Sequence, residues 1–496
     1  MDKEQEVCKA PPAADEEKSE VSRSLEEPKA RMGIRAALCL FLSGISIEPM
    51  LFVKALGDNV MKVILQKLKV ERFCTVSLNY TEEECLLMDD GNHTDMQMAA
   101  QVLDNDFSFY ETAMSSIPLL ILVFLGSWSD KHGRKVPMCL CILGYILYSG
   151  VYLLEAIFTS WPAQVLLVGV FLRSCGGGFQ TFLMVAYSFI SDRTSIRART
   201  SRMALMNAVW QSGWPAGTLL GAWIYDTSGY VAVFGTSLAL HTFCALYVII
   251  ILEDKIPKDE SVADDSGGHK CSCKSAFDLQ HVVEVTRTAF KSRPGRGRPH
   301  LLIVMSMMLL QISAYLHNTY LWSRLVLGWD QDQYSLWTTV TSTFHQVALL
   351  CVSPFLVMVH DCVAGAVQCA FSLLEDLWVA FVTRPDQWWV MYASIVVSMA
   401  PSVTSIAIRS TMSKICDKDE VGKVFSLLAI METIYPIADK ALYVAVYDAT
   451  IDTYPSAQHF VSSFFYLLLV VSFISLRISM SSVERKRARA ANDTSL

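Results

Sequence analysis

Ionisable side chains inside long apolar segments are the groups of this chain best placed to do chemistry. A charge within such a segment costs several kcal/mol unless it is paired or wetted, so it is a candidate functional residue. A guanidinium there needs an acidic partner or an anionic ligand, and a carboxylate there can carry a proton. The candidates are Lys54, Asp58, Glu111, Arg173, His241, His345, Arg409, Glu432, Asp439 and Lys440.

Arg409 and Glu432 are the strongest pair of candidates. They lie deep within two consecutive apolar segments joined by a short turn, so the segments run antiparallel and the two side chains can meet. A glutamate that alternately meets and leaves an arginine would take up a proton in one state and release it in the other. An anionic ligand could take the Arg409 contact while Glu432 is protonated. A purely structural salt bridge is the alternative interpretation.

Arg173 is a second candidate for an anion contact. It precedes a Cys-Gly-Gly-Gly string at residues 175–178, where the glycines permit a close helix approach or a local bend. Lys54 and Asp58 stand one helical turn apart, so each can neutralise the other. Asp58 is therefore a second carboxylate whose protonation could have a function.

The remaining candidates have plainer interpretations. Glu111 fits the interface between the bilayer and the water on the outer side. Asp439 and Lys440 fit the outer end of an apolar segment, where such side chains snorkel toward water or pair with a neighbour. His241 and His345 are expected to be hydrogen-bonded core residues rather than ligands or proton carriers. We assign no functional role to these five residues.

A short charged loop joins two apolar segments at residues 126–135, which read Gly-Ser-Trp-Ser-Asp-Lys-His-Gly-Arg-Lys. Asp130 and Arg134 meet if the turn is helical, and as an exposed pair they would contribute about 0–1 kcal/mol. Gly126 and Gly133 remove side chains where two helices and a turn crowd together. The lysines and the arginine hold the loop on the cytosolic side. The pattern predicts a releasable charge latch.

The segments that must position these residues are those of a membrane protein. Hydrophobic residues make up 52% of the 496 residues and charged residues 18%, against about 25% in soluble domains. A helix needs about 20 apolar residues to cross a bilayer. The sequence predicts an all-α membrane protein of twelve spans in two six-helix halves. After a first span before residue 70, spans are expected near 107–128, 136–158, 163–190, 203–225, 231–252, 301–322, 334–359, 363–382, 389–412, 421–446 and 460–476.

The first and fifth spans carry local signals. Hydropathy alone places the first span at residues 36–56, whereas Pro49 favours a helix that begins there, because its missing N–H costs nothing in a first turn. We favour the later start, which brings the Lys54–Asp58 pair into the membrane. The fifth span has a ridge of small residues along which another helix can approach closely. The ridge consists of Gly213, Gly217 and Gly221.

Clusters of Lys and Arg place both termini in the cytosol. The chain divides into a cytosolic N-terminal tail and run-up (1–46), an N-terminal half (47–252) with an outer loop at 69–104, a cytosolic linker (253–298), a C-terminal half (299–478) and a cytosolic tail (479–496). The plasma membrane and the endosome or lysosome both fit this organisation.

The outer loop predicts two kinds of covalent modification. Asn79 and Asn92 each begin an Asn-x-Thr sequon, which indicates glycosylation on the outer side. Cys74 and Cys85 share this oxidising compartment, which favours a disulfide between them. A third sequon at Asn492 lies in the cytosolic tail, where no glycan is expected.

Other function classes find little support in the sequence. It contains no Gly-x-x-x-x-Gly-Lys-Ser/Thr loop, nucleophile elbow or metal-ligand cluster, so we expect neither an enzyme nor a bound metal or other cofactor. Cys271 and Cys273 form an isolated Cys-x-Cys, which is too little for a metal site. No basic patch indicates nucleic acid. Residues 494–496 fit a C-terminal ligand of a PDZ-domain protein, a short match that chance explains as well.

The 126–135 loop closely resembles the signature loop of the major facilitator superfamily, Gly-x-x-x-Asp-x-x-Gly-Arg-Arg/Lys, between its second and third spans. Four further strings resemble one solute carrier family within it, the family of the proton-coupled folate transporter and its lysosomal relatives. The strings keep their order from the first span to the eleventh. They are Glu-Pro-x-Leu-Phe at 48–52, Ser-Arg-Met-Ala-Leu at 201–205, Ile-Arg-Ser-Thr-Met-Ser-Lys at 408–414 and Glu-Val-Gly-Lys-Val-Phe-Ser at 420–426.

The resemblance implies a twelve-helix secondary transporter of a bulky, usually anionic organic solute, with proton coupling in the folate-carrying members. Arg409 and Arg173 are then the expected anion contacts, Glu432 and Asp58 the expected coupling carboxylates, and the 126–135 loop the expected latch. A non-transporting membrane receptor or scaffold on the same fold is the alternative, although a static receptor needs no releasable latch.

Two departures from that family bear on these expectations. The folate-carrying members have a glutamate where this chain has Asn207, so proton coupling here must use another carboxylate. They also have a cysteine where this chain has Gly328, before Trp329. The missing cysteine removes another disulfide partner and strengthens the pairing of Cys74 with Cys85.

Overall fold

The computed structural model describes residues 46–253, 287, 291 and 297–494, apart from residues 82–83, 86–102, 104–106, 108–109, 112, 197, 316–318, 330, 399–401 and 418–419. Within these ranges the chain forms α-helices with short 3-10 and π segments, and no described residue lies in a β-strand. The predicted all-α class is confirmed.

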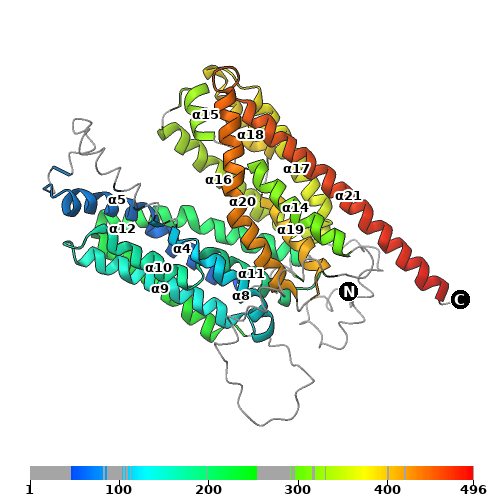
Figure 1. Ribbon diagram of the computed structural model, residues 1–496, viewed down its shortest axis with the longest axis horizontal. Helices are drawn as coiled ribbons and strands as arrows, with labels where there is room; N and C mark the ends of the chain where they lie inside the picture. The colour runs from blue at the N-terminus through cyan, green and yellow to red at the C-terminus, as the bar shows by residue number, and fades with distance from the viewer. Residues whose placement is uncertain are drawn as a thin grey trace, which may run out of the picture.

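The helices up to residue 250 pack into one bundle, the N-terminal half (Figure 1). Its longest helix, α12, packs against α4 and α9. The backbone of α12 leaves helical geometry at Gly229, with φ 74° and ψ −169°, so α12 supplies two of the expected spans. The helices are α4 (Glu48–Val60), α5 (Lys62–Arg72), α8 (Ile117–His132), α9 (Lys135–Ile157), α10 (Leu166–Cys175), α11 (Gly178–Arg193) and α12 (Arg199–Ile250).

The helices from residue 297 onward form the C-terminal half. There α17 packs against α21 and α19, and α14 packs against α19 and α21. The helices are α14 (Gly297–Tyr315), α15 (Thr319–Val326), α16 (Gln331–Val352), α17 (Asp361–Ala380), α18 (Trp389–Ser398), α19 (Ser402–Ile415), α20 (Val421–Thr450) and α21 (Ala457–Thr494).

Eight helical segments of the described residues are long and apolar enough to cross a membrane, and the interrupted α12 is one of them. Helix is present at each of the twelve expected spans, in shorter pieces at the first, second, fourth, seventh and tenth. The count of twelve crossings stays a prediction. In the first span, α4 begins at Glu48 with Pro49 in its first turn, in agreement with the later start.

The two halves meet at one end of the molecule. We call it the closed end and define it by Gly133, after α8, and by Val421, at the start of α20. Figure 1 shows the halves converging where α8, α11, α19 and α20 lie and diverging toward α5 and α15. In the N-terminal half, α8 and α11 contact α20 of the other half.

The small-residue ridge of α12 packs directly on α4. A Cβ added at Gly217 would lie 2.8 Å from the backbone oxygen of Leu56, and the same atom at Gly213 and Gly221 would also meet α4. A backbone atom cannot move aside as a flexible side chain can. The ridge therefore lets the backbones of α12 and α4 lie in contact. This contact sets the position of α4, which carries Lys54 and Asp58.

We expect Gly217→Ala to lower the apparent melting temperature of the purified protein. The added methyl group meets the backbone of α4, and overpacking of this kind costs about 1–3 kcal/mol. The control is Gly235→Ala in the same helix, where a Cβ would meet nothing within 4 Å. Equal melting temperatures for the two variants, measured by intrinsic fluorescence, would contradict the close approach.

Candidate functional site

A cavity of about 350 Å³ lies between the two halves. Its wall is formed by α11 and α12 of the N-terminal half and by α14, α19 and α20 of the C-terminal half. A site shared by two repeats is where secondary transporters bind their substrates. The polar side chains on the wall are Asn207, Gln211, Gln311, Ser402, Arg409 and Glu432, with the hydroxyl groups of Tyr187, Tyr315 and Ser405.

Arg409 in α19 and Glu432 in α20 form an ion pair on the wall of this central cavity. The Arg409 guanidinium also lies 4.9 Å from the centroid of the Tyr187 ring in α11. A ring of one half thus contacts a cation of the other, an attractive arrangement. The direct contact expected between Arg409 and Glu432 is present, and both side chains reach the cavity.

A row of amides crosses the central cavity from one half to the other. Gln211 donates from Nε2 to Asn207 Oδ1 at 3.0 Å and to Ser402 Oγ at 3.2 Å. Gln346 of the C-terminal half donates to Gln211 Oε1 at 2.6 Å. Asn207 is therefore held in a network of groups that do not titrate, although it faces the cavity.

Arg173 lies on a smaller cavity of about 280 Å³. This cavity adjoins the central one, because Phe179 lines both. The Arg173 guanidinium lies 4.7 Å from the centroid of the Tyr148 ring and donates to Ser115 Oγ at 3.5 Å. The structure thus places the two expected anion contacts on neighbouring cavities.

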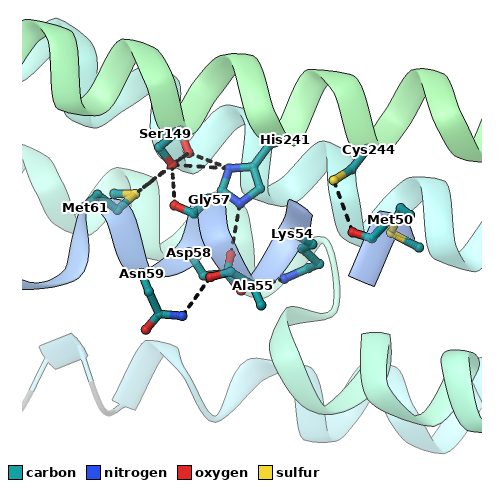
Figure 2. Close-up of polar contacts among 11 residues, drawn as sticks. Met50, Lys54, Ala55, Gly57, Asp58, Asn59, Met61, Ser149, His241 and Cys244 are labelled. Carbon is teal, nitrogen blue, oxygen red and sulfur yellow. Dashed lines mark hydrogen bonds and ion pairs between the residues drawn. The ribbon is translucent and has the colours of Figure 1, made fainter. Parts of the chain in front are cut away.

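A buried polar network joins α4 to α9 and α12 (Figure 2). Lys54 Nζ lies 2.9 Å from Asp58 Oδ2, and Asp58 Oδ1 lies 2.9 Å from His241 Nε2. His241 Nδ1 lies 2.9 Å from Ser149 Oγ. The Lys54 ammonium also lies 3.4 Å from the centroid of the Tyr145 ring. Asp58 thus neutralises Lys54 as expected, and His241 is the hydrogen-bonded core residue that the sequence predicts.

The 126–135 loop joins the two halves at the closed end through Asp130. The Asp130 carboxylate accepts hydrogen bonds from the backbone N–H groups of Gly422 at 2.9 Å and Lys423 at 3.0 Å. These amides open α20, where N–H groups lack helical partners and the helix dipole favours a negative charge. Arg134 forms ion pairs with Asp130 and with Asp192.

The Asp130–Arg134 pair is more buried than the sequence indicates. Asp130 is 9% exposed and Arg134 is 5% exposed, so the expectation of a surface pair is wrong. The opposite half covers the loop, which adds hydrogen bonds and excludes water. Of the two loop glycines, Gly126 lies inside α8, and Gly133 ends that helix with φ 94°, which glycine adopts without strain.

Asp361, at the start of α17, is the aspartate of the C-terminal half that contacts the N-terminal half. It accepts hydrogen bonds from Thr200 Oγ1 of the N-terminal half at 2.5 Å and from Lys414 Nζ at 2.6 Å. Arg199 donates across the halves to the Ser413 carbonyl at 2.8 Å. The closed end is thus held by an aspartate from each half, although the sequence around Asp361 lacks the glycines of the 126–135 loop.

Three buried or cavity-lining acidic residues were not predicted as such from the sequence. Asp439 is 3% exposed and accepts from Ser313 Oγ of α14 at 2.7 Å, so it is buried and bonded to another helix rather than snorkelling or pairing locally. Glu375 and Asp376 in α17 line a third cavity and were missed. The test applied to the other spans, an ionisable residue within an apolar segment, would have found both.

The outer loop is described in part. Cys74 and Cys85 form the disulfide that the sequence predicts, with their Cα atoms 6.0 Å apart. Asn79 is exposed beside it, so its side chain is accessible. Other residues singled out in the sequence lie outside the described residues. They are Asn92, Cys271, Cys273, Ser495 and Leu496.

Comparisons with known proteins agree with this geometry. The family model of the Major Facilitator Superfamily matches residues 97–438. The chain is 22% identical to the "Probable peptidoglycan muropeptide transporter SLC46" of Drosophila melanogaster, over 85% of this chain and 83% of that protein. It is 23% identical to the "Proton-coupled folate transporter" of Rattus norvegicus, over 66% and 69%. The crystal structure of the human organic anion transporter MFSD10 (TETRAN) matches 86% of this chain and 98% of its own with a TM-score of 0.63 at 15% identity.

The two-halved helical bundle, the 126–135 loop and these relatives define the class: an integral membrane transporter, not an enzyme. The chain belongs to the major facilitator superfamily, whose family model covers most of its length. The resemblance to the solute carrier family of the folate transporter is confirmed by the relatives.

Proposed function

We propose that this chain is a secondary active transporter that binds a bulky organic anion in the central cavity and carries it by alternating access. The observation that supports this most strongly is the Arg409–Glu432 ion pair on the wall of a cavity between the two halves. Arg409 is the main anion contact in this proposal, and Arg173 on the adjoining cavity is the second. The relatives named for muropeptide and folate transport support an organic solute.

The proposed cycle opens and closes the two ends in turn. We assign the closed end to the cytosol, because the loop that forms it carries Lys131, Arg134 and Lys135. The hydrogen bonds of Asp130 and Asp361 then hold the cytosolic side shut while the cavity receives solute from outside. Rocking of the halves breaks these bonds and releases the solute to the cytosol.

In this proposal Glu432 is the main carboxylate for proton coupling, and Asp58 is the second candidate. When an anion takes the Arg409 contact, Glu432 loses its partner and binds a proton. Asp58 contacts Lys54 and His241 at the same time, so it can lose one partner and keep the other. A static receptor or scaffold is the rival function, and the cross-half contacts of Asp130 favour a protein that moves.

An uptake panel tests the proposal. Proteoliposomes with the purified full-length chain would receive radiolabelled folate or a radiolabelled muropeptide at acidic and at neutral outer pH, against protein-free liposomes. We expect saturable uptake of at least one anion, with more uptake at acidic pH. Binding without uptake under any gradient would favour the receptor.

Glycosylation tests the proposed orientation. We expect Asn79→Gln to remove one N-glycan, because Asn79 is exposed and follows α5, toward which the halves diverge from the closed end. The measurement is the gel shift on treatment with an endoglycosidase, and Asn492→Gln is the control that should change nothing. A glycan at Asn492 would place the tail outside and reverse the orientation.

A further inference from the structure

A third cavity, of about 300 Å³, lies inside the C-terminal half. It is bounded by α14, α15, α16, α17, α18 and α21, so it is enclosed by one half rather than shared by two. Tyr315 lines both this cavity and the central one, so the two adjoin. A solute that occupies both cavities must therefore pass Tyr315, which separates them.

The wall of this cavity combines a carboxylate with aromatic rings. Glu375 in α17 faces it together with Tyr334, Trp337 and Tyr466. None of the described residues on the wall is Lys or Arg. Asp376 also lines it, with its carboxylate bonded to Ser462 Oγ. The titratable side chains of the wall are thus the two carboxylates, the imidazoles of His345 and His459 and the tyrosines, and its described residues include no guanidinium, in contrast to the other two cavities.

The N-terminal half contains a similar set of side chains, a carboxylate with aromatic rings, and there the set contacts an ammonium group. There the Lys54 ammonium pairs with Asp58 (Figure 2). It also lies 3.4, 4.7 and 5.0 Å from the ring centroids of Tyr145, Phe182 and Trp210. A carboxylate and aromatic faces together stabilise an ammonium group away from water. In the C-terminal half the chain presents the same chemistry around a cavity, and the described wall supplies no ammonium of its own.

We propose that the C-terminal cavity binds an organic ammonium group of the transported solute, with Glu375 as its ion partner. The solute class is then amphoteric: a molecule with a carboxylate for Arg409 and a primary amine for Glu375, such as a peptide with a lysine side chain. This inference rests on the proposed anion site at Arg409. The aromatic wall and the volume favour an organic ammonium over a bare inorganic cation.

Two peptides that differ in one amine test this proposal. The probes are tritiated N-acetyl-Ala-γ-Glu-Lys and the same peptide with its lysine Nε acetylated, each added to the full-length chain in proteoliposomes. Both keep the carboxylates, and only the first has an ammonium group. We expect the first to bind about tenfold or more tightly, as a charge-assisted contact in a buried site requires.

Glu375→Gln should remove this preference without weakening the acetylated peptide, and Glu375→Asp should retain most of it. Equal affinities in the wild type, a measurement that needs no variant, would overturn the proposal. A preference that survives in Glu375→Gln, or a sodium requirement shared by both peptides, would do the same.

A binding measurement separates this inference from the proposed function. The thermal shift of the purified chain in nanodiscs reports binding without transport. A larger shift with the ammonium peptide, lost in Glu375→Gln, would support the cavity even if no solute crosses the membrane. Saturable folate uptake with equal shifts for the two peptides would support the transporter and refute the cavity.

Discussion

Arg409→Ala should abolish saturable uptake of the anion identified in the panel. The Arg409 guanidinium lies on the central cavity and is only 8% exposed, so few water molecules compete for it. A hydrogen bond to a charged group contributes about 1.5–3 kcal/mol, which corresponds to a loss of about tenfold to a hundredfold in affinity. The measurement is equilibrium binding of the labelled anion to the purified variant.

Glu432→Gln should act differently from Arg409→Ala. Glutamine cannot take up or release a proton, so acid stimulation of uptake should disappear, whereas exchange of labelled for unlabelled anion at constant pH should persist. Uptake as a function of outer pH, with counterflow on the same proteoliposomes, separates the two effects. If Glu432→Gln keeps its full pH dependence, the same measurement on Asp58→Asn tests the second carboxylate.

A structural salt bridge makes a different prediction for the same two residues. Each single change would then leave a charge without its partner and lower the melting temperature, and the double change Arg409→Ala with Glu432→Gln would restore much of it. Transport would follow stability in that case. Loss of pH dependence at unchanged melting temperature would argue against a purely structural pair.

The sequence predicts the helices and the local contacts well, for physical reasons. Bilayer hydrocarbon selects long apolar segments, so their positions follow from composition alone. Contacts within one helical turn, such as Lys54–Asp58, follow from spacing. The Arg409–Glu432 contact could be predicted too, because the two segments are consecutive.

Contacts between distant segments could not be predicted in this way. Asp130 reaches amides about 290 positions further along the chain, and no local pattern indicates which helix end lies opposite it. Its burial depends on the same packing, so the surface pair expected from the loop was wrong. Likewise, nothing in the sequence around Tyr315 indicates that it separates two cavities.

Asp130→Asn should slow transport about tenfold while surface expression stays near normal. The variant keeps the size of the side chain but weakens its bonds to the N–H groups of Gly422 and Lys423 and its pairing with Arg134. Loss of charge-assisted contacts of about 1.5–3 kcal/mol would shift the population away from the state with the closed end shut. A carrier that does not hold that state no longer alternates efficiently.

The readout must separate a shifted equilibrium from a damaged fold. A single cysteine is introduced at Lys131, and the reactivity of the native cysteines is measured first as the background. The rate at which a thiol reagent labels the introduced cysteine then reports how accessible the closed end is. We expect faster labelling in Asp130→Asn and an unchanged rate in the control Asp226→Asn, since Asp226 is an exposed residue of α12. Equal turnover and labelling in Asp130→Asn and the wild type would remove the latch from the mechanism.

Gly422→Ala provides an independent test of the same contact from the opposite half. A Cβ at Gly422 would meet both the Asp130 carboxylate and the Arg134 guanidinium, so the methyl group should separate the loop from α20 without any change of charge. If the latch acts through this contact, Gly422→Ala should reproduce the labelling and the slow transport of Asp130→Asn. Combining the two changes should add little, because both remove one interaction. Additive losses would mean that Asp130 and Gly422 act separately, and the latch would then have to rest on Asp361 alone.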